Sequence, residues 1–324
     1  MSAAAAPLPR RKDLLDIESL APEEVVQLLD TARPFKELFT RSVKKVPALR
    51  GKSVLMLFYE PSTRTKTSFE IAAKRLSADV TNFAVSTSSV VKGESVLDTV
   101  ETLQAMKVDY IVVRHSSPGV PNLIARHTRA SVVNAGDGHH AHPTQALLDA
   151  YTLREVLPDL AGRRVLIVGD ILHSRVARST SRCMHKLGME IGYFGPGTLV
   201  PDTRPDFARG FTSFADALAW KPDVVYLLRL QLERMHASFI PSLREYHTVF
   251  GVTPARFRQI RDAGIWVMHP GPVNRGVELV DEVMTYERSL INQQVENGIA
   301  TRMSVLYSLQ PVTEARADDE GAGP

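Results

Sequence analysis

Apolar residues in the first half of the chain fall into short runs that alternate with amphipathic stretches. The runs predict strands at Ser53–Phe58, Val80–Phe83, Tyr110–Val113 and Ser131–Asn134. Helical spacing of apolar positions predicts helices near Thr65–Leu76, Val96–Met106 and Val120–His127. An earlier helix begins at Pro22, followed by two glutamates that favour a first helical turn. This alternation predicts a parallel sheet flanked by helices.

The second half repeats the same alternation. Its strands are predicted at Val165–Val168, Glu190–Phe194, Val224–Leu228 and Ile265–Met268. Its helices are predicted near Ser174–Leu187, Phe214–Trp220 and Thr253–Ala263, and a last helical stretch covers about Glu287 to Leu309. This pattern predicts a second parallel sheet with its own helices.

The length of 324 residues suits two domains of ordinary size. We expect an α/β fold of two domains, each a parallel sheet flanked by helices, with the active site in the cleft between them. The first domain would cover residues 13–150 and the second 151–289, and a helix at about 290–312 could pack back on the first. The small, polar or charged segments 1–12 and 315–324 are expected to be disordered.

Charge and hydropathy narrow the class of protein. The net charge is only +3, and Lys and Arg are spread along the chain, which argues against a nucleic-acid partner and suits a small anionic substrate better. No apolar run is long enough for a signal peptide or a membrane span. We therefore expect a cytoplasmic enzyme without a membrane partner.

The segment after the first strand carries four consecutive polar donors. Ser62, Thr63, Arg64 and Thr65 stand at the turn into a helix, where free backbone N–H groups and the helix dipole favour an anion. An arginine there can hold two phosphate oxygens at once. The alternative is a capped helix start with a solvent-exposed arginine. Neither a GxxxxGK[ST] loop nor a G-x-G-x-x-G turn occurs, which argues against nucleotide and dinucleotide sites.

The segment Phe58–Glu70 resembles the Phe-x-x-x-Ser-x-Arg-Thr signature of the aspartate/ornithine carbamoyltransferase family, and the resemblance extends from about Leu14 to Leu309. It implies that Ser62–Thr65 binds the phosphate of carbamoyl phosphate. It also implies that Arg114, after the third strand, contacts the carbonyl oxygen and the phosphate.

Three histidines follow the fourth strand, and they suggest a metal site. Only Asp137 lies near them as a further ligand, so we expect no metal and no cofactor. The motif His142-Pro143-x-Gln145 instead resembles the family, in which His142 would donate to the carbamoyl oxygen and Gln145 would orient the carbamoyl NH₂. His139 and His140 are expected to be exposed loop residues.

The resemblance assigns two further segments to the site. Gly271 and Pro272, after the last strand, would offer backbone carbonyls to the carbamoyl NH₂ and to the acceptor amine. Gly271 departs from the leucine of the best-known aspartate enzymes. Ser88 and Lys92 would reach into the active site of a neighbouring subunit, which implies a homotrimer. A larger assembly with a regulatory chain or a dihydroorotase-like partner remains open.

Arg175, Arg229 and Gln231 follow strands of the second half, and two arginines suit an acceptor with two carboxylates. The resemblance matches them to residues that bind aspartate in the family, with Lys92 as a further contact. The chain lacks the Ser-Met-Gly and His-Cys-Leu-Pro motifs of ornithine enzymes.

The resemblance therefore implies transfer of the carbamoyl group of carbamoyl phosphate to L-aspartate, an early step of pyrimidine biosynthesis. We expect direct attack by the amine, with catalysis by Arg64, Thr65, Arg114 and His142. The alternatives are a carbamoyltransferase for ornithine or a related amine, and a non-catalytic subunit of the same fold.

Overall fold

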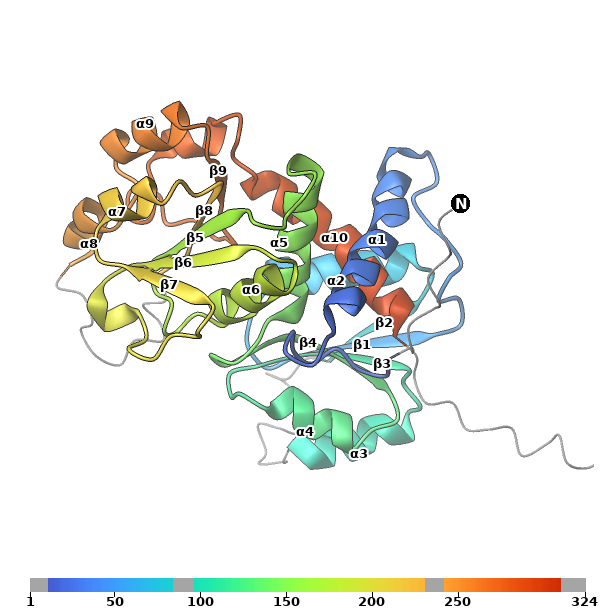
Figure 1. The fold of residues 1–324 in the computed structure, drawn as a ribbon. Helices are drawn as coiled ribbons and strands as arrows, with labels where there is room; N and C mark the ends of the chain where they lie inside the picture. Colours follow the sequence, from blue (N-terminus) through green and yellow to red (C-terminus); the bar gives the residue numbers. More distant parts are fainter. Residues whose placement is uncertain (1–10, 84–95, 231–241, 310–324) are drawn as a thin grey trace, which may run out of the picture.

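The computed structural model describes residues 11–83, 96–230 and 242–309, and in these ranges the strands form two parallel sheets (Figure 1). The first sheet has the order β2-β1-β3-β4 and consists of β1 (Ser53–Phe58), β2 (Asp79–Phe83), β3 (Tyr110–His115) and β4 (Ser131–Asp137). The second has the order β7-β6-β5-β8-β9 and consists of β5 (Arg164–Val168), β6 (Glu190–Phe194), β7 (Ala208–Phe211), β8 (Val224–Leu227) and β9 (Trp266–Met268). The predicted fold class is confirmed.

Helices cover both faces of the first sheet because its strands are apolar on both faces. Val54 and Met56 of β1 face a layer of α1 (Pro22–Glu37), α2 (Thr63–Arg75), α5 (Pro143–Val156) and α10 (Ile291–Ser308). Leu55 and Leu57 face α3 (Val96–Ala105) and α4 (Val120–Arg126) on the opposite side (Figure 1). The alternation along β1 thus divides the core of this half into two layers.

The second sheet is covered in the same way. Val165 and Ile167 pack against α5 and α6 (Arg175–Lys186), whereas Leu166 and Val168 pack against α7 (Phe214–Ala219) and α9 (Pro254–Asp262). The short helix α8 (Leu243–Val249) contributes only Tyr246 to the buried set. The helix α10, which follows the second sheet in sequence, returns to pack against α1, α2 and α5 of the first half (Figure 1).

The order of strands fixes where a ligand can bind. In the first sheet the chain runs from β1 to β2 on one side and then crosses to β3 on the other, so the direction reverses between β1 and β3. The second sheet reverses in the same way between β5 and β8. Open parallel sheets bind ligands at the carboxyl ends of the strands where the order reverses. Both reversal points carry predicted site residues.

Two elements of the second half were not predicted from sequence, β7 and α8. The residues of β7 are only partly buried, and those of α8 are mostly polar, so neither produces an apolar run. Arg11 and Lys12, expected in the disordered N-terminal segment, instead contact the Glu24 carboxylate and the Ala125 carbonyl. Among the described helices, none combines the length and the hydropathy needed to cross a bilayer.

Candidate active site

The carboxyl ends of the two sheets border one cleft of about 490 Å³. Of the residues predicted from sequence, the cleft is lined by Ser62, Arg64, Thr65, Arg114, His142, Gln145, Arg175, Arg229, Gly271 and Pro272. Thr63 is exposed in the first turn of α2 and is not among the lining residues. Ser88, Lys92 and Gln231 lie outside the described residues. The fold therefore gathers residues that are more than 200 positions apart, such as Ser62 and Pro272, around one space.

The turn from β1 into α2 carries the predicted phosphate-binding residues. Ser62 has extended backbone angles at the N-cap position, and α2 begins at Thr63, so the free N–H groups of the first turn belong to this segment. Arg64 lies against Gly271 of the opposite half, where the backbone φ is +62° and a Cβ would collide with the guanidinium. Burial lowers the pKa of Arg64, and the positive charge of Arg229 lowers it further. An arginine keeps its charge despite such a shift, so the turn offers a cation to an anion in the cleft.

Glu60, which no sequence pattern indicates, joins two of the predicted arginines. Its carboxylate accepts a two-pronged pair of hydrogen bonds from Arg175, at 2.8 and 3.0 Å, and a further bond from Arg114. Arg175 also donates to the carbonyl of Gly138 at 3.3 Å. A Cβ at Gly136 would lie 2.9 Å from the Arg175 guanidinium, so only glycine leaves room for it there. Glu60 thus connects the first half of the chain to the start of α6.

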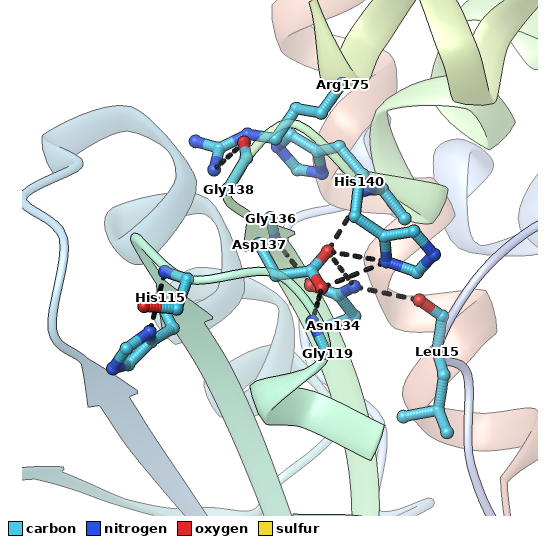
Figure 2. A network of polar contacts seen from close by, with 12 residues as sticks. Leu15, His115, Gly119, Asn134, Gly136, Asp137, Gly138, His140 and Arg175 are labelled. Atoms are coloured by element: carbon cyan, nitrogen blue, oxygen red, sulfur yellow. Dashed lines mark hydrogen bonds and ion pairs between the residues drawn. The ribbon is translucent and has the colours of Figure 1, made fainter. Parts of the chain in front are cut away.

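The turn between β4 and α5 is organised by the buried Asp137 (Figure 2). Its carboxylate accepts hydrogen bonds from the backbone N–H groups of Gly119 and Ala141, at 2.8 and 3.0 Å, and from the Asn134 side chain at 2.8 Å. The His140 ring lies 3.0 Å from the same carboxylate. The turn leads directly into His142, the N-cap of α5, whose N–H donates to Ser179 at 2.9 Å. The network therefore sets the position of the predicted carbonyl-binding histidine.

The histidines of this turn are engaged in separate local contacts. His139 is exposed, as expected, and contacts the carbonyl of His173 at 2.8 Å. His140 is only partly exposed, because it contacts Asp137. Among the residues that the structure describes, no group of three His, Cys, Asp or Glu side chains is arranged to hold a metal ion.

The segment after β9 closes the opposite side of the cleft. The buried His269 accepts a hydrogen bond from the Gly271 N–H through Nδ1 at 2.8 Å. Burial, with the positive charges of Arg64 and Arg229, lowers the pKa of His269 to about 3. The ring is therefore neutral at pH 7, and because Nδ1 accepts, its proton lies on Nε2. His269 thus shapes the turn without adding to the positive charge of the cleft.

Glu278 ties this turn to the end of β8. The buried carboxylate accepts from the Leu230 N–H at 3.0 Å and from the Asn274 side chain at 2.8 Å. Burial raises the pKa of Glu278, although these hydrogen bonds act in the opposite direction. Leu230 follows Arg229, so Glu278 holds the backbone next to a predicted substrate-binding residue.

The charge of the cleft is strongly unbalanced. Glu60 is the one acidic residue among the described lining residues, whereas six arginines line the cleft: Arg64, Arg114, Arg175, Arg229, Arg275 and Arg302. Such a site attracts anions and disfavours a cationic ligand. Arg302, Ser68 and Gln294 were not predicted from sequence, because they lie on helix faces rather than after strands.

Comparison with known proteins agrees with this arrangement. The carbamoyl-P binding domain of the aspartate/ornithine carbamoyltransferase family matches residues 12–155, and the Asp/Orn binding domain of the same family matches residues 161–309. A protein of Akkermansia muciniphila, named aspartate carbamoyltransferase catalytic subunit, is 68% identical over 304 residues, which are 94% of this chain and 98% of that protein. A protein of Endomicrobium trichonymphae with the same name is 52% identical over 95% of this chain and 98% of its own length.

The solved structures that resemble this chain include aspartate transcarbamoylases of lower sequence identity. Aspartate transcarbamoylase from Trypanosoma cruzi in complex with carbamoyl phosphate superposes with a TM-score of 0.83 at 28% identity, over 93% of this chain and 97% of that chain. The catalytic subunit of M. jannaschii aspartate transcarbamoylase superposes with a TM-score of 0.79 at 32% identity, over 92% and 97% of the two chains. Together these matches span nearly all of the sequence, and the chain belongs to the aspartate/ornithine carbamoyltransferase family.

Proposed function

We propose that this chain is an aspartate carbamoyltransferase, which transfers the carbamoyl group of carbamoyl phosphate to L-aspartate and releases N-carbamoyl-L-aspartate and phosphate. The observation that carries the proposal is the cleft itself, where the β1–α2 turn of the first half faces Arg175 and Arg229 of the second. The T. cruzi relative has been solved in complex with carbamoyl phosphate and aspartate.

Carbamoyl phosphate binds to the first half of the chain in this proposal. Ser62, Arg64 and Thr65 hold its phosphate at the N-terminus of α2, and Thr63, whose side chain is exposed, contributes through its backbone N–H. The backbone N–H groups and the helix dipole add to the arginine charge. Arg114 contacts both the phosphate and the carbonyl oxygen. His142 donates to the carbonyl oxygen, while Gln145 and the carbonyls of Gly271 and Pro272 accept from the carbamoyl NH₂.

Aspartate binds to the second half through its two carboxylates. Arg175, Arg229 and Gln231 hold them, and Lys92 is a further contact. The excess of arginines among the lining residues favours this dianionic acceptor over ornithine, whose side chain is cationic. Glu60 holds Arg175 in place from the first half of the chain and so links the two substrate regions.

The reaction is a direct attack of the neutral aspartate amine on the carbonyl carbon. The C–N bond forms as a tetrahedral intermediate, whose oxyanion is stabilised by Thr65, Arg114 and His142. The C–O bond to phosphate then breaks, Arg64 stabilises the leaving phosphate, and the amine proton passes to that phosphate. Orientation and preorganised charge provide the acceleration.

We propose a homotrimer in which Ser88 and Lys92 of one subunit complete the site of the next. This part of the proposal rests on the resemblance to the family, because both residues lie outside the described ranges. A regulatory chain or a dihydroorotase-like partner could join such a trimer.

The test is a carbamoyl transfer assay with carbamoyl phosphate and several amines. We expect N-carbamoyl-L-aspartate and phosphate to form in equal amounts, and ornithine and N-acetylornithine to give little product. A preference for either of these amines would show that the preferred amine, and not aspartate, is the acceptor. No transfer to any amine by the correctly folded chain would favour a non-catalytic subunit.

A further inference from the structure

A fully buried carboxylate, Asp149, lies one helical turn beyond Gln145 on α5. Its Oδ1 accepts hydrogen bonds from Gln145 Nε2 at 2.9 Å and from Gln294 Nε2 at 2.7 Å. Its Oδ2 accepts from Thr180 at 3.0 Å and from Tyr226 at 2.7 Å. Asp149 therefore binds side chains from α5, α6, β8 and α10, and one of them, Gln145, lines the cleft.

The direction of these bonds fixes the Gln145 amide. A glutamine amide has one accepting end, the oxygen, and one donating end, the NH₂ group. A carboxylate can only accept, so Asp149 holds the Gln145 NH₂ on the side away from the cleft. The Gln145 oxygen is then the end available to a ligand. That is the polarity needed by a carbamoyl NH₂ group, which can only donate.

Gln294 reinforces this polarity from the other side. Its Oε1 accepts from the backbone N–H of His269 at 3.0 Å, so its NH₂ must face Asp149. Residue 149 consequently has to present an acceptor at the Oδ1 position. The same chain of bonds connects Gln145 to the backbone of His269, which begins the turn that contains Gly271.

The amide N–H groups of Gln145 and Gln294 both point at the carboxylate and favour its ionised, accepting form. Burial raises the pKa of Asp149 to about 6, against the effect of four hydrogen bonds that favour the ionised form. Keeping such a charge in the interior is costly unless all of its oxygens are bonded. Arg302 of α10 lies close enough for the two charges to interact, which offsets part of this cost.

We propose that Asp149 is a positioning residue for carbamoyl transfer: it locks the Gln145 amide with its oxygen toward the carbamoyl NH₂ and ties it, through Gln294, to the turn after β9. This inference rests on the proposed function, in which Gln145 binds the carbamoyl group. Asp149 itself does not touch the substrate.

A double-mutant cycle on kcat/KM for carbamoyl phosphate tests the inference. Asp149→Leu removes every acceptor and should lower kcat/KM about 10- to 100-fold, as expected when a reacting group is misplaced. Gln145→Ala should give a similar loss. The double variant should be little worse than Gln145→Ala alone, because both changes remove the same interaction. A loss equal to the product of the two single losses would overturn the proposal.

Two further variants separate positioning from structural support. Thr180→Val removes a donor to Oδ2 and leaves Oδ1 intact, so it should lower the melting temperature and leave kcat/KM within about threefold. Asp149→Asn should also stay within about threefold. Gln294 requires an acceptor at the Oδ1 position, so the asparagine oxygen takes that position. The asparagine NH₂ then faces the hydroxyls of Thr180 and Tyr226. A folded Asp149→Asn protein as impaired as Gln145→Ala would overturn the proposal, even if Asp149→Leu does not fold.

A failure of the proposed function can be distinguished from a failure of the role of Asp149. If the wild-type chain does not transfer the carbamoyl group to aspartate, the same cycle is measured on the affinity for carbamoyl phosphate by calorimetry. Non-additive losses in affinity would still support the role of Asp149, and additive losses would exclude it.

Discussion

Arg64 illustrates how a single residue of this chain depends on both halves of the fold. It comes from the turn after β1, yet its guanidinium lies against Gly271, which follows β9. Its position in the helix start was predictable from the local sequence, because hydroxyl donors and an arginine follow a buried strand. Its contact with Gly271 was not, because no local pattern links residues so far apart.

Replacing Arg64 by alanine should lower kcat about 10²–10³-fold, the usual cost of losing one preorganised charge at a reacting centre. Steady-state kinetics with carbamoyl phosphate and aspartate give the measurement. Arg261→Ala is the matched control, because Arg261 is exposed on α9, pairs with its neighbour Asp262 and is not among the residues that line the cleft. Equal kinetics of the two variants would remove Arg64 from the site.

Glu60→Gln should raise the KM for aspartate more than the KM for carbamoyl phosphate. The amide cannot accept from Arg175 through both atoms, so the arginine loses the two-pronged pair that orients it. Kinetics with each substrate varied in turn provide the measurement. An unchanged KM for aspartate would mean that Glu60 does not orient Arg175 for this substrate.

At the scale of elements, a helix cap sets where a helix begins and therefore where a cleft residue in its first turn lies. Ser174 caps α6 by accepting from the Ala177 N–H at 3.1 Å, and Arg175 is the first residue of that helix. Ser213 caps α7 through the Asp216 N–H at the same distance, and it is not among the residues that line the cleft. The two serines therefore form a matched pair.

Ser174→Ala and Ser213→Ala should each lower the free energy of unfolding by about 1 kcal/mol. Only Ser174→Ala should also raise the KM for aspartate, because its loss frees the first turn that carries Arg175. Urea denaturation and steady-state kinetics of both variants test this expectation. A rise in KM that is equal for the two would point to general destabilisation.

The acid sensitivity of the whole molecule should depend in part on His269. Its folded pKa of about 3 lies below the unfolded value of 6.5. Between these two pH values the unfolded chain binds a proton that the folded chain does not. Stability from this group is therefore complete above pH 6.5 and falls as the pH drops toward 3. Glu278 Oε2 lies 3.9 Å from its Nε2, and Arg64 and Arg229 oppose protonation.

His269→Gln should accordingly flatten the decline in stability between pH 6.5 and about 4, by up to about 1.4 kcal/mol per pH unit. Urea midpoints measured at one protein concentration across this range provide the test, because assembly would otherwise shift them. Parallel pH profiles of wild type and variant would contradict the prediction.

The proposed trimer predicts complementation between two inactive chains. A Lys92→Ala chain mixed with an Arg64→Ala chain should regain activity after subunit exchange, because some sites of the hybrid then receive both wild-type residues. The mixture is compared with each variant alone. No gain in activity after verified exchange would count against a shared site.

The sequence by itself determined the two α/β halves, because apolar runs and helical periods are local properties of the chain. It also determined the donor-rich turn at Ser62–Thr65 and the arginines after the strands, because the ends of buried strands are recognisable. It did not reveal β7, α8, Glu60 or Asp149. The first two lack an apolar pattern, and a lone carboxylate has no local signature.

Only the tertiary structure decided which of these residues meet. Two parallel sheets whose strand orders reverse at β1/β3 and β5/β8 bring their carboxyl ends to one cleft. The pairing of Glu60 with Arg175, and of Asp149 with Gln145 and Gln294, follows from packing across segments distant in sequence. Such pairs depend on the distances between side chains, which the order of residues along the chain does not contain.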